Sequence, residues 1–526
     1  MSEPVVQEAD QVEAATQQFR SQVGHISRHS GMYFAGTVFT IALSYVFKIY
    51  LARTLGAEAL GIYALGMTLI GFIGLVNSLG LPQSAVRFVA AYEAKGQFKE
   101  LHALLWRGAL LLLVANMALA VVVLTAGPWI AVRFYHSPAL VRYLPFFALI
   151  MLFGVENSFY RQVLAGYRDL KIRTLIVNFL GAPLNMLVAV ILISIGFGLR
   201  GYLLAQIFSA AVICVLLIAA VRHFTPAAAR LTAQPGMYPE RRVWSFSVAV
   251  LGISFLDFLL NQADRITIGF FRSPRELGVY SVAAALVGYI PLILTSINQI
   301  FAGTIAQLHT RGEHAMLSRL FQSLTKWVTG LTLPLVLVVI VFSRPLMRLF
   351  GPDFAAGWPI LIIGALGQLV NCGVGSVGYM LLMSGHEKRL MRAQGAMAIA
   401  MVVLCAALVP SKGIIGAAIA ASISTIGINV WNLIEVRRCL AFSPYNRGYL
   451  KLLFPTLASI AVILAFKTYS GLLPHRDWVV IAIAMVLSYG VFASLLVLSG
   501  LDADDRLIAS AVWTRIHGAL GGGLRT

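Results

Sequence analysis

The chain has 526 residues, of which 59% are hydrophobic and only 12% are charged, and its formal net charge is +19. A soluble domain would carry about twice that charged fraction, so the composition excludes an ordinary soluble protein. The positive charge does not indicate nucleic acid as a partner, because 27 of the 40 Lys and Arg residues fall on one side of the predicted membrane spans. The positive-inside rule then places both termini in the cytoplasm, where basic residues contact anionic lipid head groups.

Runs of about 18 to 28 apolar residues, each long enough to cross a bilayer as a helix, recur along the chain. Backbone polar groups in lipid must be satisfied within their own segment, so these runs are predicted to be helices. The predicted fold is an all-α integral membrane protein with fourteen transmembrane helices. The predicted spans are 31–52, 58–81, 103–126, 141–163, 174–195, 200–221, 244–271, 277–306, 326–343, 357–384, 391–410, 414–435, 450–468 and 478–499.

The spans group into two six-helix units followed by a C-terminal helix pair. A basic, proline-containing segment separates the two units, and the last residues follow the spacing of a short amphipathic helix. The predicted division is a polar cytoplasmic tail at 1–29, an N-terminal six-helix lobe at 30–222, a cytoplasmic linker at 223–243, a C-terminal six-helix lobe at 244–438, helices 13 and 14 at 439–500 and a cytoplasmic amphipathic tail at 501–526.

The sequence of the second span returns in the eighth. The segment LGIYALGMTLIGF (60–72) matches LGVYSVAAALVGY (277–289) at an offset of 217 residues, and Gly198 matches Gly413 at an offset of 215. Because six is an even number, two six-helix copies share one orientation, which predicts parallel repeats related by an axis along the membrane normal. A duplicated membrane bundle is typical of secondary transporters, so transport is the leading functional hypothesis.

The seventh span carries ionisable residues at membrane depth, where each costs about 2.5–3.5 kcal/mol on insertion scales. Asp257, Asn261 and Asp264 fall at i, i+4 and i+7 and therefore share one helical face, and Arg265 lies beside that face. Two interpretations stay open. The residues form an ion-coupling site for Na+ or H+, or Asp264 and Arg265 form a buried structural pair that holds the helix to its neighbours.

The first span carries Lys48, which corresponds to Arg265 at the 217-residue offset. Two cations related by a pseudo-two-fold axis would face each other across a central cavity. That arrangement suits an anionic cargo such as a pyrophosphate, because charge-assisted hydrogen bonds to its oxygens are strong. The alternative for Lys48 is a side chain that reaches the nearby membrane interface.

Two further arginines are weaker candidates for the cavity. The fourth span contains Glu156, Asn157 and Arg161, and Arg161 either lines the cavity or marks the cytoplasmic interface. Arg87, at the end of the second span, either captures a head group or anchors the span by the positive-inside rule.

No catalytic or metal site is predicted. The chain has no GxxxxGK[ST] phosphate loop, its four cysteines form no CxxC pair and no histidine falls in the middle of a span. No cofactor is expected, apart from Na+ or H+ as a coupling ion.

Several segments together resemble the polysaccharide flippases of the MOP exporter superfamily, over residues 30 to about 500. They are LARTLGAEALGIYALGMTLIGFIGLVNSLGLPQSAVRFVA (51–90), LAGYRDLKIRTLIVNFLG (164–181), DRITIGFFRSPRELGVYSVAAALVGY (264–289) and LLMSGHEKRLM (381–391). The resemblance implies two six-helix lobes in a V shape, a cationic central cavity and alternating access coupled to Na+ or H+. Lys48 and Arg265 match the intramembrane cations of such flippases.

The cargo that the resemblance implies is an oligosaccharide on undecaprenyl pyrophosphate, which moves from the cytoplasmic to the outer leaflet of the inner membrane. O-antigen, capsule or exopolysaccharide assembly would use it, with a polymerase and chain-length machinery as partners. Two alternatives stay open. One is an exporter of lipid II or small molecules from the same superfamily. The other is a membrane polymerase or glycosyltransferase, which the short outer loops disfavour because they offer no scaffold for a catalytic site.

Overall fold

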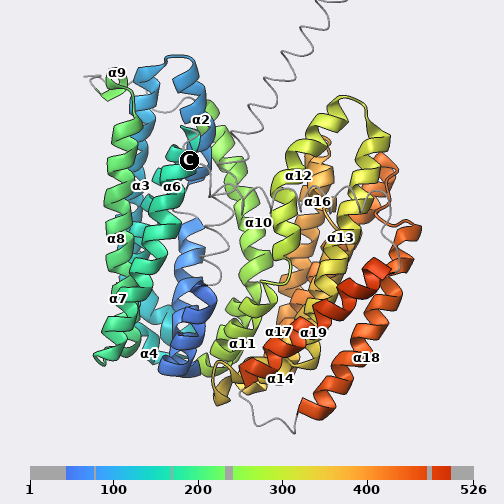
Figure 1. Ribbon diagram of the computed structural model, residues 1–526. Coiled ribbons are helices and arrows are strands. Elements are labelled where there is room, and N and C mark those ends of the chain that lie inside the picture. The colour runs from blue at the N-terminus through green and yellow to red at the C-terminus, as the bar shows by residue number, and fades with distance from the viewer. Residues whose placement is uncertain (1–42, 76–78, 168–169, 231–240, 471–476, 499–526) are drawn as a thin grey trace, which may run out of the picture. The chain divides into compact units, whose positions relative to one another are not determined.

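The computed structural model describes residues 43–75, 79–167, 170–230, 241–470 and 477–498 of the chain (Figure 1). The helices divide into two structural units. Unit 1 consists of the described residues up to Leu55 together with Gly66–Phe255. Unit 2 consists of Gly56–Leu65 together with the described residues from Leu256 onward. The predicted tails at 1–29 and 501–526 lie outside the described residues, as does the part of the predicted linker at 231–240.

Unit 1 is built from helices that follow one another along the chain. The first described helix is Leu43–Leu75, and its residues Gly56–Leu65 belong to unit 2. The other elements of unit 1 are α2 (Leu81–Ala94), α3 (Phe98–Trp129), η1 (Ile130–Phe134), α4 (Pro138–Val141), α5 (Leu144–Gly166), α6 (Leu170–Thr174), η2 (Leu175–Gly181), α7 (Ala182–Ser194), α8 (Gly198–Phe224), α9 (Ala227–Arg230) and the first part of α10 (Arg241–Phe271).

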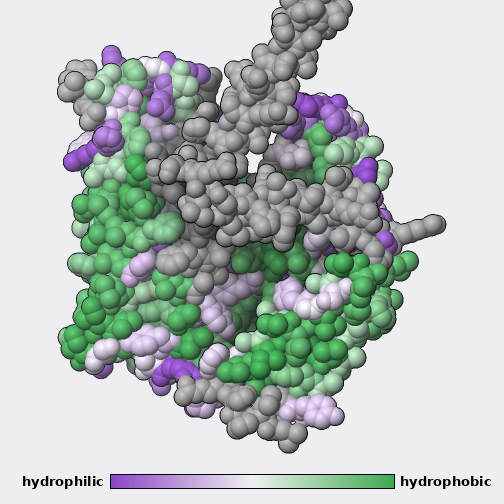
Figure 2. Space-filling model, in the orientation of Figure 1, coloured by the Kyte–Doolittle hydropathy of each residue, from purple (hydrophilic) through white to green (hydrophobic). Residues whose placement is uncertain are grey.

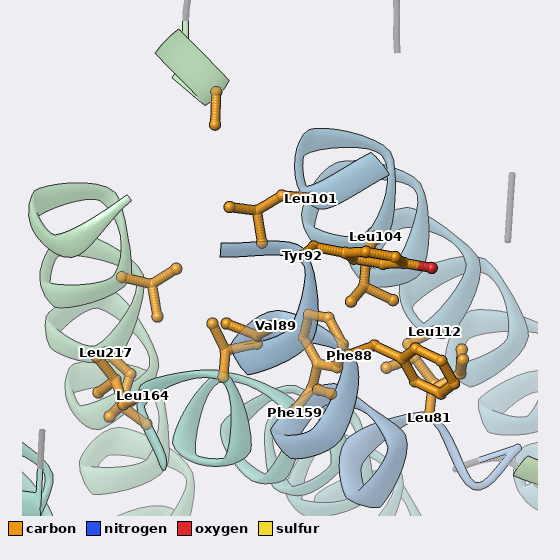
Figure 3. Close-up of a cluster of buried hydrophobic side chains, with 14 of the residues drawn as sticks. Leu81, Phe88, Val89, Tyr92, Leu101, Leu104, Leu112, Phe159, Leu164 and Leu217 are labelled. Atoms are coloured by element: carbon orange, nitrogen blue, oxygen red, sulfur yellow. The ribbon is translucent and has the colours of Figure 1, made fainter. Parts of the chain in front are cut away.

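A cluster of buried apolar side chains holds α2, α3, α5 and α8 together (Figure 3). Phe88 and Val89 of α2 meet Leu104 of α3, and Phe159 of α5 and Leu217 of α8 complete the contact. Leu104, Phe159 and Leu217 are at most 2% exposed. Burial of one such side chain stabilises the fold by about 1.5–3 kcal/mol in water. In lipid, where tails are as apolar as leucine, close packing contributes instead.

Unit 2 contains the second part of α10 and the helices that follow it. They are α11 (Pro274–Val287), α12 (Leu292–Thr310), α13 (His314–Val341), α14 (Ser343–Arg348), η3 (Pro352–Gly357), α15 (Trp358–Val374), α16 (Val377–Met383), α17 (Glu387–Leu440), η4 (Arg447–Leu452), α18 (Leu453–Ser470) and α19 (Asp477–Leu498).

The chain marks the start of α11 with strong local signals. Ser273 caps the helix and accepts a hydrogen bond from the N–H of Glu276, whose carboxylate accepts one from the N–H of Ser273. Pro274 occupies the first turn, where its missing N–H costs nothing. This capping box fixes the point at which the repeated LGVY segment enters its helix.

The C-terminal pair α18 and α19 packs on α13 (Figure 1). Ser488 and Tyr489 of α19 donate hydrogen bonds to the carbonyl oxygens of Pro334 and Leu331, at 3.2 and 2.8 Å. Proline interrupts the hydrogen-bond ladder of its own helix. The α19 hydroxyls therefore satisfy α13 carbonyls beside that interruption.

The described residues contain nine helices that are long and apolar enough to cross a membrane, or ten if the bent pair of α11 and the start of α12 counts as one. The predicted number of fourteen is higher partly because two long helices each cover two predicted spans. Helix Leu43–Leu75 contains Gly56 at φ +79°, and α17 contains Gly413 at φ +58°, so each has an interruption where the predicted spans meet. The count of fourteen stays a prediction.

The two glycines matched by the 215-residue offset both have positive φ angles. Gly198 has φ +52° and Gly413 has φ +58°, a region that side chains other than glycine rarely occupy. Each lies between two helical segments, α7 and α8 in one case and the two arms of α17 in the other. The local fold thus agrees with the sequence match, whereas the parallel layout of whole repeats stays a prediction.

Three predicted boundaries were wrong. The second span was predicted to end at residue 81, whereas the helix that contains most of it is Leu43–Leu75. Arg87 lies in the separate helix α2, after a turn at Leu79 and Gly80. The eighth span is broken between α11 and α12, which meet at a bend of 52°. Lys326, at the predicted boundary of a cytoplasmic loop, lies inside α13 and is only 7% exposed.

The outer surface of the helices is apolar, as a protein in lipid requires. Figure 2 shows hydrophobic residues over the helices α7 and α8, with hydrophilic residues gathered toward the helix ends. Large apolar side chains that are at least half exposed there include Leu187, Ile195, Phe208 and Val215. A soluble protein rarely exposes so large an apolar surface. The chain is therefore a multi-pass membrane protein.

Candidate functional site

Three of the predicted site residues are linked along α10. The side-chain amide of Asn261 donates hydrogen bonds to the carbonyl oxygen of Asp257 at 2.8 Å and to its Oδ1 at 3.2 Å. One turn further on, Nη1 of Arg265 donates to the carbonyl oxygen of Asn261 at 3.0 Å. Asp257 and Asn261 are exposed and Arg265 is half-buried, so they form a continuous polar stripe. We call Asp257, Asn261 and Arg265 the α10 stripe.

Asp264 lies on the same helix but in a different environment. It is 7% exposed, and its Oδ2 accepts a hydrogen bond from the hydroxyl of Tyr280 on α11 at 2.6 Å. Its Oδ1 accepts one from the backbone N–H of Arg265 at 2.7 Å. Both carboxylate oxygens therefore have donors, and the carboxylate ties α10 to α11.

The guanidinium of Arg265 is not the group that donates to the carboxylate of Asp264. Its Nη1 instead donates to Oε1 of Gln262 at 2.6 Å, in addition to the carbonyl oxygen of Asn261. The Asp264–Arg265 pair that the sequence left open as a structural alternative is thus replaced by an Asp264–Tyr280 pair. Tyr280 is 2% exposed and carries no charge, so sequence spacing alone did not mark it.

Lys48 lies near the start of helix Leu43–Leu75 and is half-buried. Its neighbour Phe47 packs against Tyr202 of α8, with ring centroids 6.0 Å apart. Lys48 belongs to unit 1 and Arg265 to unit 2. The structure describes each cation in its own unit, so their meeting across a cavity stays a prediction.

The two other predicted cations differ in exposure. Arg161 on α5 is half-buried, and its Nε donates to the carbonyl oxygen of Asn157 at 3.2 Å. Arg87 on α2 is exposed, with its guanidinium carbon 5.8 Å from the centroid of the Phe88 ring. The position of Arg87 on a short helix after the turn at Gly80 suits a contact with head groups at the membrane surface.

Sequence reasoning missed Lys326 as a buried cation. The apolar residues Leu317, Phe321 and Val328 on either side of it follow helical spacing, and the structure buries all three on α13. That periodicity could have extended the ninth span toward its N-terminus and placed Lys326 inside it. Among the described residues, no group of three His, Cys, Asp or Glu side chains is placed to hold a metal ion.

The repeated LGxY segments meet each other in unit 2. A Cβ atom added to Gly61 would overlap the carbonyl oxygen of Pro274, and one added to Gly278 would overlap the carbonyl oxygen of Ala57. The offset of 217 residues that relates Gly61 to Gly278 also relates Ala57 to Pro274. The contact is therefore reciprocal, as a local two-fold axis between two copies requires. We call these four residues the glycine crossing.

Two family models match the chain. The model described as "Polysaccharide biosynthesis protein" matches residues 26–309, more than half of the chain, and the model described as "MatE" matches residues 249–419. The polar and basic residues described above, from Lys48 to Arg265, lie within the first match.

Two curated relatives are transport proteins. The chain is 24% identical over 363 residues to "Succinoglycan biosynthesis transport protein ExoT" of Rhizobium meliloti, covering 66% of this chain and 67% of that protein. It is 24% identical over 412 residues to "Probable flippase AglR" of Haloferax volcanii, covering 76% of this chain and 82% of that protein.

Solved structures share the fold. The structure titled "Lipid II flippase MurJ, inward closed conformation" matches with a TM-score of 0.68 at 15% identity, covering 88% of this chain and 97% of that one. An inward-facing multidrug resistance MATE family transporter of the MOP superfamily matches with a TM-score of 0.63 at 16% identity, covering 76% of this chain and 94% of that one. The all-helical membrane fold, the family matches and the transport proteins among its relatives agree, and the chain belongs to the polysaccharide biosynthesis protein family, a family of transporters in the MOP superfamily.

Proposed function

We propose that the chain is a flippase that moves an undecaprenyl-pyrophosphate-linked oligosaccharide from the cytoplasmic to the outer leaflet of the inner membrane. The observation that carries this proposal is the α10 stripe. Asp257 and Asn261 are exposed on a helix whose other exposed residues include Ile253 and Phe255. Exposed polar groups within a predicted membrane span need water or a polar ligand, so the stripe favours a hydrated path for a polar head group.

Lys48 and Arg265 are the proposed ligands of the pyrophosphate. Both are half-buried, and a partly buried cation interacts with an anion more strongly than one in bulk water. Arg161 and Arg87 are proposed as further contacts for the head group, Arg87 at the membrane surface. The prenyl tail would stay in lipid, against the apolar outer surface of the helices.

Ion coupling completes the proposed cycle. Asp257, Asn261 and Asp264 are the candidates on α10 for binding Na+ or H+. An ion shifts the equilibrium between two states only by its difference in affinity for them. Asp257 is the better candidate for ion binding of the two carboxylates, because Asp264 already has hydrogen-bond donors at both oxygens.

The proposed setting is polysaccharide assembly at the inner membrane, with both termini in the cytoplasm. The name of the Rhizobium relative supports an exopolysaccharide pathway, and the name of the Haloferax relative supports a flippase. A polymerase and chain-length machinery acting on the outer leaflet are the proposed partners, because a translocated oligosaccharide unit must be polymerised there.

The first test replaces the two cations. We expect Lys48→Ala and Arg265→Ala each to abolish polysaccharide export, since each removes a charge-assisted contact that is worth about 1.5–3 kcal/mol. Export is measured in a strain that lacks the chromosomal gene, at equal protein level in the membrane. The lipid-linked oligosaccharide should accumulate in those cells.

Arg275→Ala is the matched control. Arg275 is exposed and pairs with exposed Asp353 at 2.8 Å, a surface contact worth about 0–1 kcal/mol. Export should continue in this variant. Normal export by both Lys48→Ala and Arg265→Ala, at wild-type protein level, would remove the two cations from the cargo site.

A further inference from the structure

A carboxyl group outside the α10 stripe lies buried in unit 1 without a hydrogen-bond partner for one of its oxygens. Glu156 on α5 is 7% exposed, and its buried Oε1 has no hydrogen-bond partner among the described residues. Oδ1 of the adjacent Asn157 is in the same condition. The amide of Asn157 donates to the carbonyl oxygen of Ala210 on α8 at 3.0 Å, which places this pair at the contact of α5 with α8.

The surroundings of Glu156 are apolar. Val155 and Phe159, on either side of it along α5, belong to the buried cluster of unit 1, and Phe159 is drawn in Figure 3 with Leu217 of α8. The electrostatic neighbours of Glu156 in the described part of the chain are Tyr160 on α5 and Cys214 on α8. Both are uncharged at neutral pH.

Basic groups also lie on the helices around Glu156. Arg161 donates to the carbonyl oxygen of Asn157, Arg222 on α8 is in electrostatic contact with Tyr160, and Arg173 on α6 with Arg161. Burial disfavours the charged form of Glu156. The helices α2 and α3, which pack against α5, also carry titratable groups. They are Arg87, Tyr92, Glu93, Lys99, Glu100, His102 and Arg107.

A buried carboxylate without a cation partner is costly, by several kcal/mol after relaxation of the protein. Protonation removes the charge and with it most of this cost, so burial favours the neutral acid. A metal cation would need several oxygen ligands. The buried side-chain oxygens of α5 without a hydrogen-bond partner are Oε1 of Glu156 and Oδ1 of Asn157, and a single proton on Glu156 removes its charge.

We propose that Glu156 is a second ion site, outside the α10 stripe, at which the transporter takes up and releases a proton during its cycle. The inference rests on the proposed function, because a proton cycle matters only in a protein that alternates between states. In the described state, α5 and α8 enclose the neutral acid. A state in which water reaches this contact stabilises the carboxylate and releases the proton, so proton binding favours the closed contact.

The test measures the proton on purified full-length protein in detergent. Infrared difference spectra between low and high pH report the C=O band of each protonated carboxyl that titrates. We expect the wild type to lose such a band as the pH rises, and Glu156→Gln to lack it. Glu156→Asp should keep the band at a shifted frequency, which covers the case in which the glutamine variant fails to fold. Asp353→Asn, which removes an exposed carboxyl in η3, should leave the band in place.

Three results would overturn the proposal. They are a titrating band that persists unchanged in Glu156→Gln, a band lost in Asp353→Asn instead, and binding of radioactive sodium that Glu156→Gln abolishes. In cells, the dependence of polysaccharide export on external pH should flatten in Glu156→Gln. A different result would contradict the proposed function, namely unchanged polysaccharide export in a strain that lacks the chain. The infrared result does not depend on that outcome.

Discussion

Tyr280 donates its hydroxyl proton to Asp264 across the junction of α10 and α11, and neither side chain is more than 7% exposed. A hydrogen bond to a buried charged group contributes more to the stability of the fold than one between neutral groups. When such a bond is lost, the acceptor oxygen stays buried without water or a donor, which costs its desolvation free energy. The pair is therefore expected to stabilise the protein even though Asp264 is also a candidate for ion coupling.

We expect Tyr280→Phe to destabilise the protein by about 1–3 kcal/mol, because Oδ2 of Asp264 stays buried without its donor. Thermal unfolding of the purified protein in detergent measures the effect. Asp264→Asn should lose less, since its amide oxygen can accept the N–H of Arg265 while its NH2 group donates to the hydroxyl oxygen of Tyr280. Tyr469→Phe is the control, because Tyr469 is 69% exposed and its hydroxyl reaches the surroundings. Equal unfolding temperatures for Tyr280→Phe and wild type would contradict the argument.

At the level of single residues, the sequence predicted which side chains share a helical face better than it predicted their hydrogen-bond partners on other helices. Helical geometry alone places Asp257, Asn261 and Arg265 on one face, and the structure links them by hydrogen bonds. The partner of Asp264 depends on how far α11 is rotated against α10, which spacing within α10 does not contain. Lys326 was missed because positive charge was counted as a loop signal, although its apolar neighbours continue the helix.

At the scale of elements, glycine positions decide where helices approach and where they break. In the glycine crossing the obstacle on each side is a backbone carbonyl, of Pro274 or of Ala57. A side chain can change rotamer to admit an added methyl group, but a helical backbone cannot. The two helical segments must therefore separate if either glycine gains a Cβ atom.

We expect Gly61→Ala and Gly278→Ala each to destabilise the protein by about 1–3 kcal/mol or more, as overpacking does. The double variant should cost less than the sum, because the first substitution already separates the segments. Thermal unfolding measures all three. Gly74→Ala in the same helix is the control, since a Cβ at Gly74 has no atom within 4 Å. A wild-type unfolding temperature for Gly61→Ala would show that this approach is not tight.

Helix breaks inside apolar runs were the least predictable part of the fold. The predicted spans 277–306 and 357–384 are each interrupted, between α11 and α12 and at Gly375, which has φ +76°. An apolar average over a whole span does not register a break of a few residues. By contrast, the gap between the predicted spans 391–410 and 414–435 contains Gly413, where the structure interrupts α17.

At the scale of the whole molecule, orientation in the membrane follows from the distribution of Lys and Arg. Lys388, at the start of α17, and Asp353, in η3, are both exposed. The predicted order of the spans puts them on opposite sides of the membrane. The positive-inside rule predicts Lys388 in the cytoplasm and Asp353 outside.

Cysteine labelling tests that orientation. In a variant without the four native cysteines, we expect Asp353→Cys to react with a membrane-impermeant thiol reagent added to intact spheroplasts. Lys388→Cys should react only after the membrane is opened. The reverse pattern would place both termini outside and invert the proposed direction of transport.

The glycine crossing also explains where the internal repetition of the chain is easiest to see. Most positions of the two matched segments, 60–72 and 277–289, differ between them. Where the two segments meet, a Cβ atom at Gly61 or at Gly278 would overlap a backbone carbonyl of the helix that carries the other segment. The glycine of LGxY therefore meets the same steric restriction in both segments. The clearest internal sequence match of this chain thus lies where each matched segment limits the residues that the other can accept.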